Sequence, residues 1–342
     1  MASEVDSQTT KKKSDSRRRV LKSVGRGLLF VFGVAAVVAL VHEAGPDAVL
    51  RTLLEAGIYL PFVLLLEVAF MSLDVVALRS FLGERAQSVP VLVWLRTAMV
   101  AYGVMILLPA GRAGGEVARA TGLAPYVGPS HAAALATRLQ AATLLGNTLI
   151  SLPAWLAVAF SVSFATPLAW MVLVNGLGTA LIGGAIVFAS RRSSVGGFLA
   201  KRIRAFALHG EEFDVALRDE VAWTRPIMAT FLGRVLQAVQ YGIILAAVGG
   251  RLTPVSALVA QGIHLVGAGL GDLVPNQVGI TEGAYRLFAP ALGLENAPAR
   301  AIGIALVARL CQFFLAGTAL GISSVWKLAP PKAKATATPA PT

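Results

Sequence analysis

Two stretches of this sequence, LVWLRTAMVAYGVMILLPAGRAGGE (residues 92–116) and LVAQGIHLVGAGLGDLVPNQVGITE (residues 258–282), decide how the chain is organised. Each is an apolar segment that runs into a turn rich in proline and glycine and ends on a glutamate. A later helix follows each one, ALATRLQAATLLG (134–146) after the first and ALVARLCQFFLAG (305–317) after the second. Alignment of these two helices pairs Arg138 with Arg309, so the sequence predicts an internal repeat.

The composition around these stretches places the chain in a membrane. Of 342 residues, 56% are hydrophobic and 14% are charged, and the mean hydropathy is +0.71. Soluble domains carry about 25% charged residues, and the apolar residues here occur in runs of membrane length. We therefore expect an all-α integral membrane protein. The formal net charge of +12 is concentrated at the N-terminus and in one central loop, which indicates membrane topology and no nucleic-acid partner.

Apolar helices are expected near residues 25–42, 57–78, 131–159, 166–190, 226–249 and 299–326. Residues 1–24 and 329–342 are expected to be disordered tails around a membrane domain of residues 25–328. The basic N-terminal region and the apolar run after it favour an uncleaved anchor over a signal peptide.

The remaining apolar stretches, 89–110 and 255–274, decide the topology. The loop 191–225 holds seven Lys/Arg and should be cytoplasmic. The loop is cytoplasmic if residues 89–128 enter the membrane and return to the same side. The C-terminus is also cytoplasmic if residues 255–292 do the same. We expect six spans plus two re-entrant hairpins in the cell (inner or plasma) membrane, with both termini cytoplasmic. Eight plain spans are the alternative.

Under this count the first hairpin enters from the cytoplasm and the second from outside. The chain then forms two inverted halves, about 25–160 and 166–328. Inverted repeats with broken helices are typical of alternating-access transporters, whose binding site lies near the membrane midplane. The segments 109–116 and 275–282 would line a polar cavity, because irregular backbone at membrane depth survives only against protein or water. Ordinary interfacial loops are the alternative. The expected turn residues are Pro109, Gly111, Gly114, Pro275 and Gly279.

Charged side chains inside the apolar segments are the candidate binding residues. Ionisable groups at membrane depth are costly and usually functional, and arginine suits bidentate contact with phosphate. The predicted lipid-binding set is Arg112, Glu116, Arg138, Arg234, Asn276, Glu282 and Arg309. Arg234, Gln237 and Tyr241 form a polar stripe at helical spacing, and Glu67 and Asp74 share one helix face. Salt bridges that only fix helix packing are the alternative.

Signals for an enzyme are poor. The four histidines are scattered, the single cysteine, Cys311, lies in an apolar run, and no nucleophile motif or phosphate-binding loop is present. We expect no catalytic residues, no metal and no cofactor.

These motifs give a family resemblance. PAGRAGGE before an ALxxRL helix, and PNQVGITEG before ALVARL, resemble the transmembrane region of lysylphosphatidylglycerol synthases, also called the flippase-like domain, over about residues 20–328. The resemblance implies movement of lipids such as aminoacylated phosphatidylglycerol between leaflets, and some relatives accompany polyprenyl-linked sugar or hopanoid pathways. The family often has Pro-Gly-Gly where this chain has Pro275-Asn276-Gln277. The cytosolic aminoacyl-transfer domain of the full-length synthases is not expected here.

The sequence thus predicts a lipid flippase or lipid-carrier transporter for an anionic phospholipid or polyprenyl-linked lipid. Two alternatives stay open. One is an ion-coupled transporter of a soluble anion, and the other is a membrane scaffold or partner of a lipid- or envelope-modifying enzyme.

Overall fold

The computed structural model describes residues 31, 34–108, 111–192, 210–219, 221–271 and 277–326, and for Arg112 it describes only the backbone. These residues form helices and connecting turns, with no strand among them. The expected tails 1–24 and 329–342 lie outside the described residues. So does the beginning of the expected first helix 25–42, of which the later part is seen in the helix Val34–Ala44.

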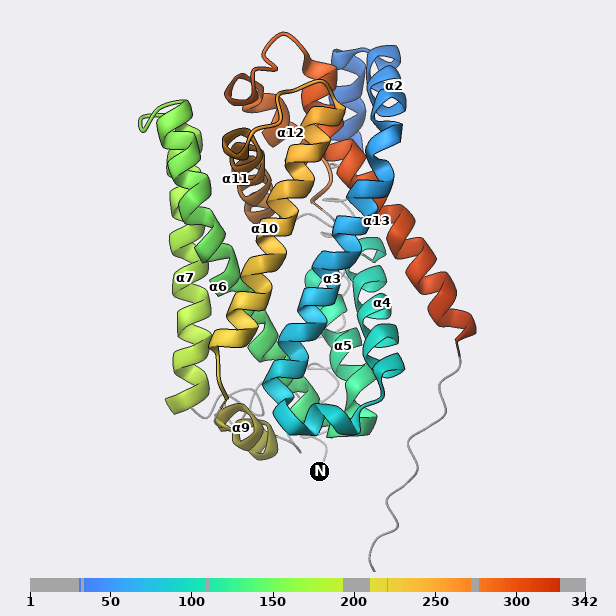
Figure 1. Cartoon of the computed structure of the whole chain (residues 1–342), viewed down its shortest axis with the longest axis vertical. Helices are drawn as coiled ribbons and strands as arrows, with labels where there is room; N and C mark the ends of the chain where they lie inside the picture. Colours follow the sequence, from blue (N-terminus) through green and yellow to red (C-terminus); the bar gives the residue numbers. More distant parts are fainter. Residues whose placement is uncertain are drawn as a thin grey trace, which may run out of the picture.

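The first part of the chain forms an antiparallel series of helices (Figure 1). Their bounds are α2 Pro46–Glu55, η1 Ala56–Tyr59, α3 Leu60–Leu82, η2 Gly83–Ser88, α4 Val91–Leu107, α5 Gly111–Val127, α6 Pro129–Ser161 and α7 Pro167–Arg192. The second part continues with α9 Gly210–Arg218, α10 Thr224–Ala247, α11 Pro254–Gly271, α12 Ile280–Leu287, η5 Ala289–Leu292 and α13 Pro298–Val325. Prolines in the first turn start several helices, because their missing N–H and fixed φ suit that position.

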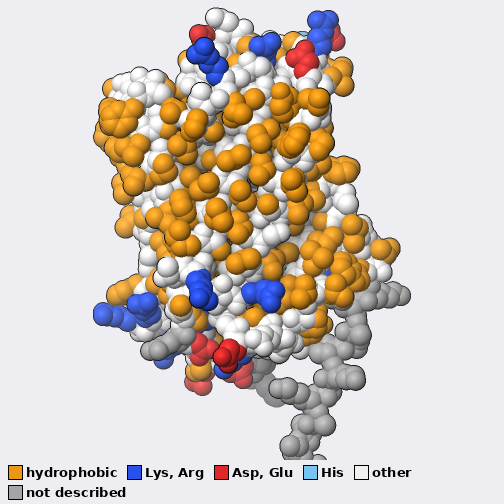
Figure 2. All heavy atoms as spheres, in the orientation of Figure 1, with side chains coloured by type: hydrophobic (Ala, Val, Ile, Leu, Met, Phe, Trp, Pro, Cys, Tyr) orange, Lys and Arg blue, Asp and Glu red, His pale blue; other side chains and the backbone are white. Residues whose placement is uncertain are grey.

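Six helical segments of the described chain are long and apolar enough to cross a membrane: Pro46–Ser88, Pro129–Ser161, Pro167–Arg192, Thr224–Ala247, Pro254–Gly271 and Pro298–Val325. Large hydrophobic side chains on them face outward, as Leu65, Phe160, Leu181 and Phe314 do. Figure 2 shows a broad hydrophobic belt with the charged side chains gathered at the two ends. The chain is therefore an all-α, multi-pass membrane protein, as predicted. By length and composition α11 qualifies as a span, although the sequence placed it in a hairpin.

Two shorter helix pairs occupy opposite ends of the bundle. In Figure 1, α4 and α5 lie side by side in the half nearer α9, while α11 and α12 lie in the half nearer α2. We call these halves the α9 end and the α2 end. The predicted irregular segments are shorter than expected, because residues 111–116 belong to α5 and 280–282 to α12. Gly114 is thus a helical residue and the prediction of a turn there was wrong, whereas Gly111 and Gly279 have φ of +54° and +83°.

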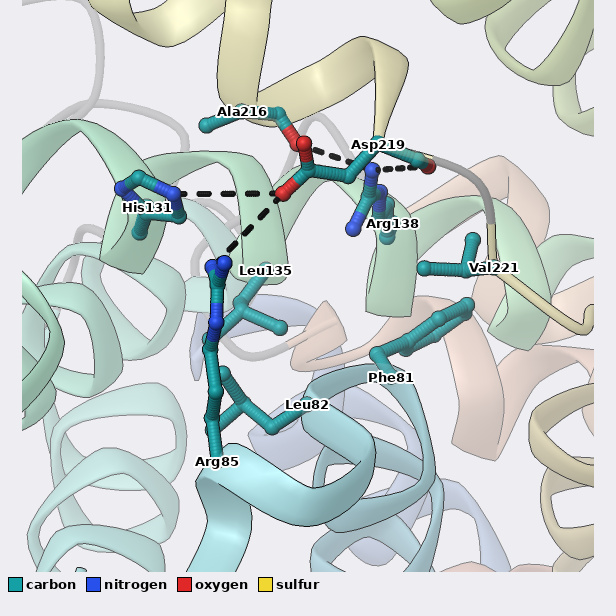
Figure 3. Close-up of a pocket in the computed structure, with 9 residues that line it drawn as sticks. All are labelled: Phe81, Leu82, Arg85, His131, Leu135, Arg138, Ala216, Asp219 and Val221. Carbon is teal, nitrogen blue, oxygen red and sulfur yellow. Dashed lines mark hydrogen bonds and ion pairs between the residues drawn. The ribbon is translucent and has the colours of Figure 1, made fainter. Parts of the chain in front are cut away.

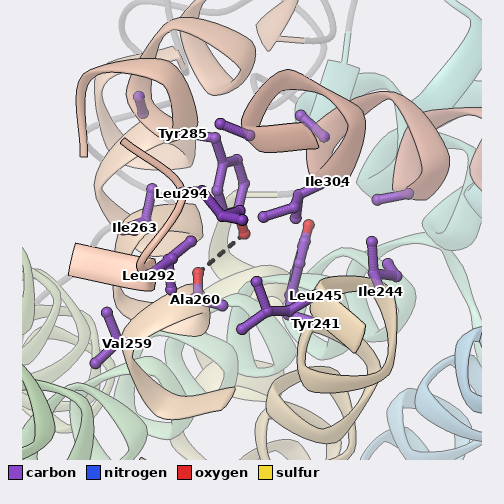
Figure 4. Close-up of a cluster of buried hydrophobic side chains, with 14 of the residues drawn as sticks. Tyr241, Ile244, Leu245, Val259, Ala260, Ile263, Tyr285, Leu292, Leu294 and Ile304 are labelled. Carbon is purple, nitrogen blue, oxygen red and sulfur yellow. Dashed lines mark hydrogen bonds between the residues drawn. The ribbon is translucent and has the colours of Figure 1, made fainter. Parts of the chain in front are cut away.

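The largest core cluster joins α10, α11, α12 and α13 (Figure 4). Tyr285 of α12 is fully buried in it, and its hydroxyl donates a hydrogen bond to the carbonyl of Ala260 at 2.9 Å. This bond satisfies the one polar atom that the ring carries into the apolar core. It also fixes α12 against α11, which positions the residues that follow.

Candidate functional site

The most deeply buried ion pair in the described chain joins α12 to α13. Arg309, near the middle of α13, donates from Nε to Oε1 of Glu282 at 2.7 Å. The side chain of Glu282 is 0% exposed and that of Arg309 is 13% exposed. Both residues were predicted as binding residues, and the structure brings them into direct contact.

Glu282 also closes the turn in front of α12. Its Oε2 accepts a hydrogen bond from the backbone N–H of Gly279 at 2.9 Å. The turn is tight: Gln277 is a non-glycine residue with φ of +56°, a conformation that costs energy for residues with a Cβ. The N-terminus of α12 is therefore already occupied by its own carboxylate, so an external anion would bind at Arg309 and not at the N–H groups of this helix.

A second buried carboxylate, Glu67 of α3, lies in the same part of the bundle. Glu67 is 2% exposed and accepts hydrogen bonds from the Tyr102 hydroxyl at 2.7 Å and from Nε2 of Gln240 at 2.8 Å. These donors come from α4 and α10, so one carboxylate ties three helices together. A buried charge persists only when it is hydrogen-bonded or paired.

Arg234 and Gln237 of α10 form the predicted polar stripe. Nη1 of Arg234 donates to Oε1 of Gln237 at 2.8 Å, and Gln261 of α11 donates to the same oxygen at 3.2 Å. The guanidinium of Arg234 also lies 5.0 Å from the centroid of the Phe70 ring, a cation–π distance.

Tyr241 connects the groups. Its hydroxyl lies 2.7 Å from Nδ1 of His264. The residue lies within electrostatic range of both carboxylates and both arginines, which are Glu67, Arg234, Glu282 and Arg309. We call these four charged residues with Tyr241, Gln237 and Gln261 the central cluster. It contains groups that can bind an anion and exchange one carboxylate partner for another oxyanion.

Arg138 lies elsewhere, at the α9 end. Its Nη2 donates to the carbonyl oxygens of Ala216 at 2.8 Å and Asp219 at 2.9 Å (Figure 3). These carbonyls lie at the end of α9, where helix carbonyls lack partners within the helix. The guanidinium therefore caps α9 and holds it against α6, although the sequence repeat paired Arg138 with Arg309.

Glu116 also has a different partner from Glu282, the glutamate at the matching position of the predicted repeat. It accepts a hydrogen bond from Nη1 of Arg119, one turn later in α5, at 3.1 Å. Arg119 is itself 3.6 Å from the carboxylate of Asp74 on α3. This ion-pair chain joins α5 to α3. The hydrogen bonds of Arg138 go to α9.

Several residues that build these sites were missed from the sequence: Tyr102, Arg119, Gln240 and Gln261. Arg119 could have been found from its spacing, since Glu116 and Arg119 are three residues apart on one helix. The two glutamines carry no charge, and only the fold shows that they face buried acids and amides.

Four predicted site residues cannot be placed. Pro109, Pro275 and Asn276 lie outside the described residues, and the side chain of Arg112 does as well. In the part of the chain that the structure covers, no group of three or more His, Cys, Asp or Glu is arranged to hold a metal ion. No protein-family model matches the chain, and no curated protein matches it.

Proposed function

We propose that this chain is a lipid flippase or lipid-carrier transporter of the flippase-like type, which moves an anionic lipid between the two leaflets. The observation that carries the proposal is the central cluster. Glu67, Arg234 and Glu282 are buried and the side chain of Arg309 is 13% exposed, and the four lie near one another where helices from both parts of the chain meet. Ionisable groups at such depth are expensive, and in membrane proteins they usually mark a substrate pathway.

The Arg309–Glu282 pair supplies the chemistry. A guanidinium binds a carboxylate and a phosphate with the same planar fork of N–H donors. A headgroup phosphate that reaches Arg309 would therefore replace Glu282, and Glu282 would resume the contact when the headgroup leaves. Arg234 would take up part of the phosphate charge, while the acyl chains remain in the bilayer. Aminoacylated phosphatidylglycerol and polyprenyl-linked phosphates both present such a group.

The proposed topology has α4–α5 and α11–α12 as re-entrant hairpins of two inverted halves. Its support is that the two pairs lie in opposite halves of the bundle (Figure 1). We propose that the α9 end is cytoplasmic, because Arg191 and Arg218, described residues of the basic 191–225 loop, lie there. Each hairpin tip would then reach the central cluster from its own side.

Leaflet exchange tests the function directly. The purified protein is reconstituted into vesicles that contain fluorescently labelled phosphatidylglycerol, and the fraction accessible to a membrane-impermeant quencher is followed over time. We expect exchange in the wild type and its loss in Arg309→Lys and Glu282→Gln. Arg286→Gln is the matched control, because Arg286 is an α12 arginine in an exposed pair with Glu43. Unchanged exchange in both central variants would remove these residues from the mechanism.

Cysteine labelling tests the topology. In a Cys311→Ser background, single cysteines at Arg112 and Asn276 are treated with a membrane-impermeant maleimide in oriented vesicles. We expect the two positions to label from opposite sides. Labelling of both from one side would defeat the inverted hairpins and leave plain spans.

The two alternative functions, a soluble-anion transporter and a membrane scaffold, predict different results with the same protein preparations. Uptake of a soluble anion into vesicles without lipid exchange would indicate an ion-coupled transporter. Co-purification with a lipid-modifying enzyme, together with tolerance of the Arg309 variant, would indicate a membrane scaffold.

A further inference from the structure

A second basic site lies at the α9 end, apart from the central cluster. A cavity of about 310 Å³ opens there between four elements of the chain. Its walls are the end of α3, the turn η2, the start of α6, and α9 together with Asp219 and Val221. The lining residues are Phe81, Leu82, Arg85, His131, Leu135, Arg138, Ala216, Asp219 and Val221 (Figure 3). A volume of this size lies at the lower limit of pockets that hold small organic ligands.

The basic side chains of this cavity lie at two depths. Arg138 is 4% exposed and forms the buried part, whereas Arg85 and His131 are more exposed. Nη2 of Arg138 is fixed by two carbonyl groups, and its buried Nε has no hydrogen-bond partner among the described residues. The guanidinium is thus held rigidly and still has donor capacity.

The carboxylate of Asp219 lies between Arg85 and His131. Oδ2 of Asp219 lies 3.9 Å from Nη1 of Arg85 and 3.9 Å from Nε2 of His131. Both distances exceed that of a charge-assisted hydrogen bond, which is about 2.7–2.9 Å. The carboxylate therefore neutralises the mouth of the cavity without satisfying its donors.

We propose that this cavity binds a phosphate group between Arg85, His131 and Arg138, with the side chain of Asp219 displaced outward. A phosphate brings more acceptor oxygens and more negative charge than the single carboxylate. The apolar side, formed by Phe81, Leu82, Leu135 and Val221, accommodates the hydrocarbon next to a phosphate ester. The ligand is therefore a phosphate ester, supplied by a lipid headgroup or by a soluble metabolite. The site does not depend on transport through the central cluster.

Calorimetric titration of the full-length protein in neutral detergent tests the proposal. Three probes separate the sources: inorganic phosphate, glycerol 3-phosphate and dioctanoyl phosphatidic acid. Binding of the two soluble probes assigns the site to a soluble ligand, and binding of the lipid alone assigns it to a headgroup. Dioctanoyl phosphatidylcholine controls for detergent-like binding of the acyl chains. Absence of saturable binding by all three phosphate probes would overturn the proposal.

Two variants test the cavity without changing Arg138, which holds α9 in place. Arg85→Gln should weaken binding about three- to tenfold, because one charged partner of the phosphate is lost. Asp219→Asn should tighten binding by a similar factor, because the competing charge is removed while the backbone carbonyl that accepts from Arg138 remains. Arg79→Gln is the matched control, an exposed α3 arginine that does not line the cavity. Equal affinity in all of these variants would contradict the site.

The central variant Arg309→Lys separates this proposal from the transport function. It should lose leaflet exchange and keep phosphate-ester binding at the α9 end. Loss of binding in Arg309→Lys, with Arg85→Gln unaffected, would place the phosphate at the central cluster and overturn the second site.

Discussion

Arg138 and Arg309 occupy matching positions in the predicted repeat, yet their surroundings differ. Arg309 meets a buried carboxylate, Glu282, in the middle of the bundle. Arg138 meets two backbone carbonyls at the α9 end. One arginine therefore forms a charge pair that a phosphate could replace, and the other completes the end of a helix beside a basic cavity.

The hairpins explain the difference. In the second hairpin, α12 has 8 residues, and Glu282 lies in its first turn against α13. In the first hairpin, α5 has 17 residues, and Glu116 in its second turn pairs with Arg119 of the same helix. In addition, α9 packs on α6 through Phe213 and Leu217, which brings its carbonyls to Arg138. Two similar stretches of sequence can thus share residue types while the neighbouring elements decide their partners.

The largest effect is expected when the central pair is broken. Glu282→Gln leaves the guanidinium of Arg309 buried without its charge partner, which should cost about 3–5 kcal/mol of unfolding free energy. Denaturant unfolding of the purified protein in mixed micelles measures this loss. The double variant Glu282→Gln/Arg309→Gln should recover part of it. Glu43→Gln, in the exposed pair, should change stability by less than about 1 kcal/mol; a similar loss there would refute the buried-pair explanation.

A smaller and more local loss of stability is expected when Arg138 is changed. Arg138→Gln removes charged donors from two carbonyls, which should cost about 1.5–3 kcal/mol, mostly in the docking of α9. Hydrogen exchange should show faster exchange in residues 210–218 and little change in α12. If both helices lost protection equally, the two arginines would share one role and the contrast would fail. Ser130→Ala, which loses a hydrogen bond to Glu212 of α9, should give the same pattern more weakly.

The smallest effect concerns how closely the helices of each hairpin approach. A Cβ at Gly115 would lie 2.9 Å from the carbonyl oxygen of Ala101, so Gly115→Ala should destabilise the α4–α5 contact by about 1–3 kcal/mol. At Gly267, in the second hairpin, the nearest atom would be 3.2 Å away, and the cost should be lower. Gly184→Ala meets nothing within 4 Å and should be neutral or stabilising. Thermal denaturation in detergent ranks the three, and the reverse order would contradict this packing.

The sequence predicted the helices well where hydropathy and proline placement agree. The expected helix 131–159 is observed as Pro129–Ser161 and the expected helix 226–249 as Thr224–Ala247. It was less accurate at the glycine-rich segments. GRAGGE was read as a turn, but in α5 its backbone groups can be satisfied by helical hydrogen bonds and Gly115 allows close packing against α4.

The sequence by itself determined the class of protein, because apolar runs of membrane length with few charges are typical of membrane-spanning helices, in which every backbone polar group is satisfied within the segment. It also pointed to the residues that carry the rare intramembrane charges. Only the tertiary structure decided which of them meet, since pairing depends on helix length and on the angle at which elements separated by many residues pack. Glu282 reaches Arg309 and Arg138 reaches α9 for that reason, and no spacing along the chain encodes either contact.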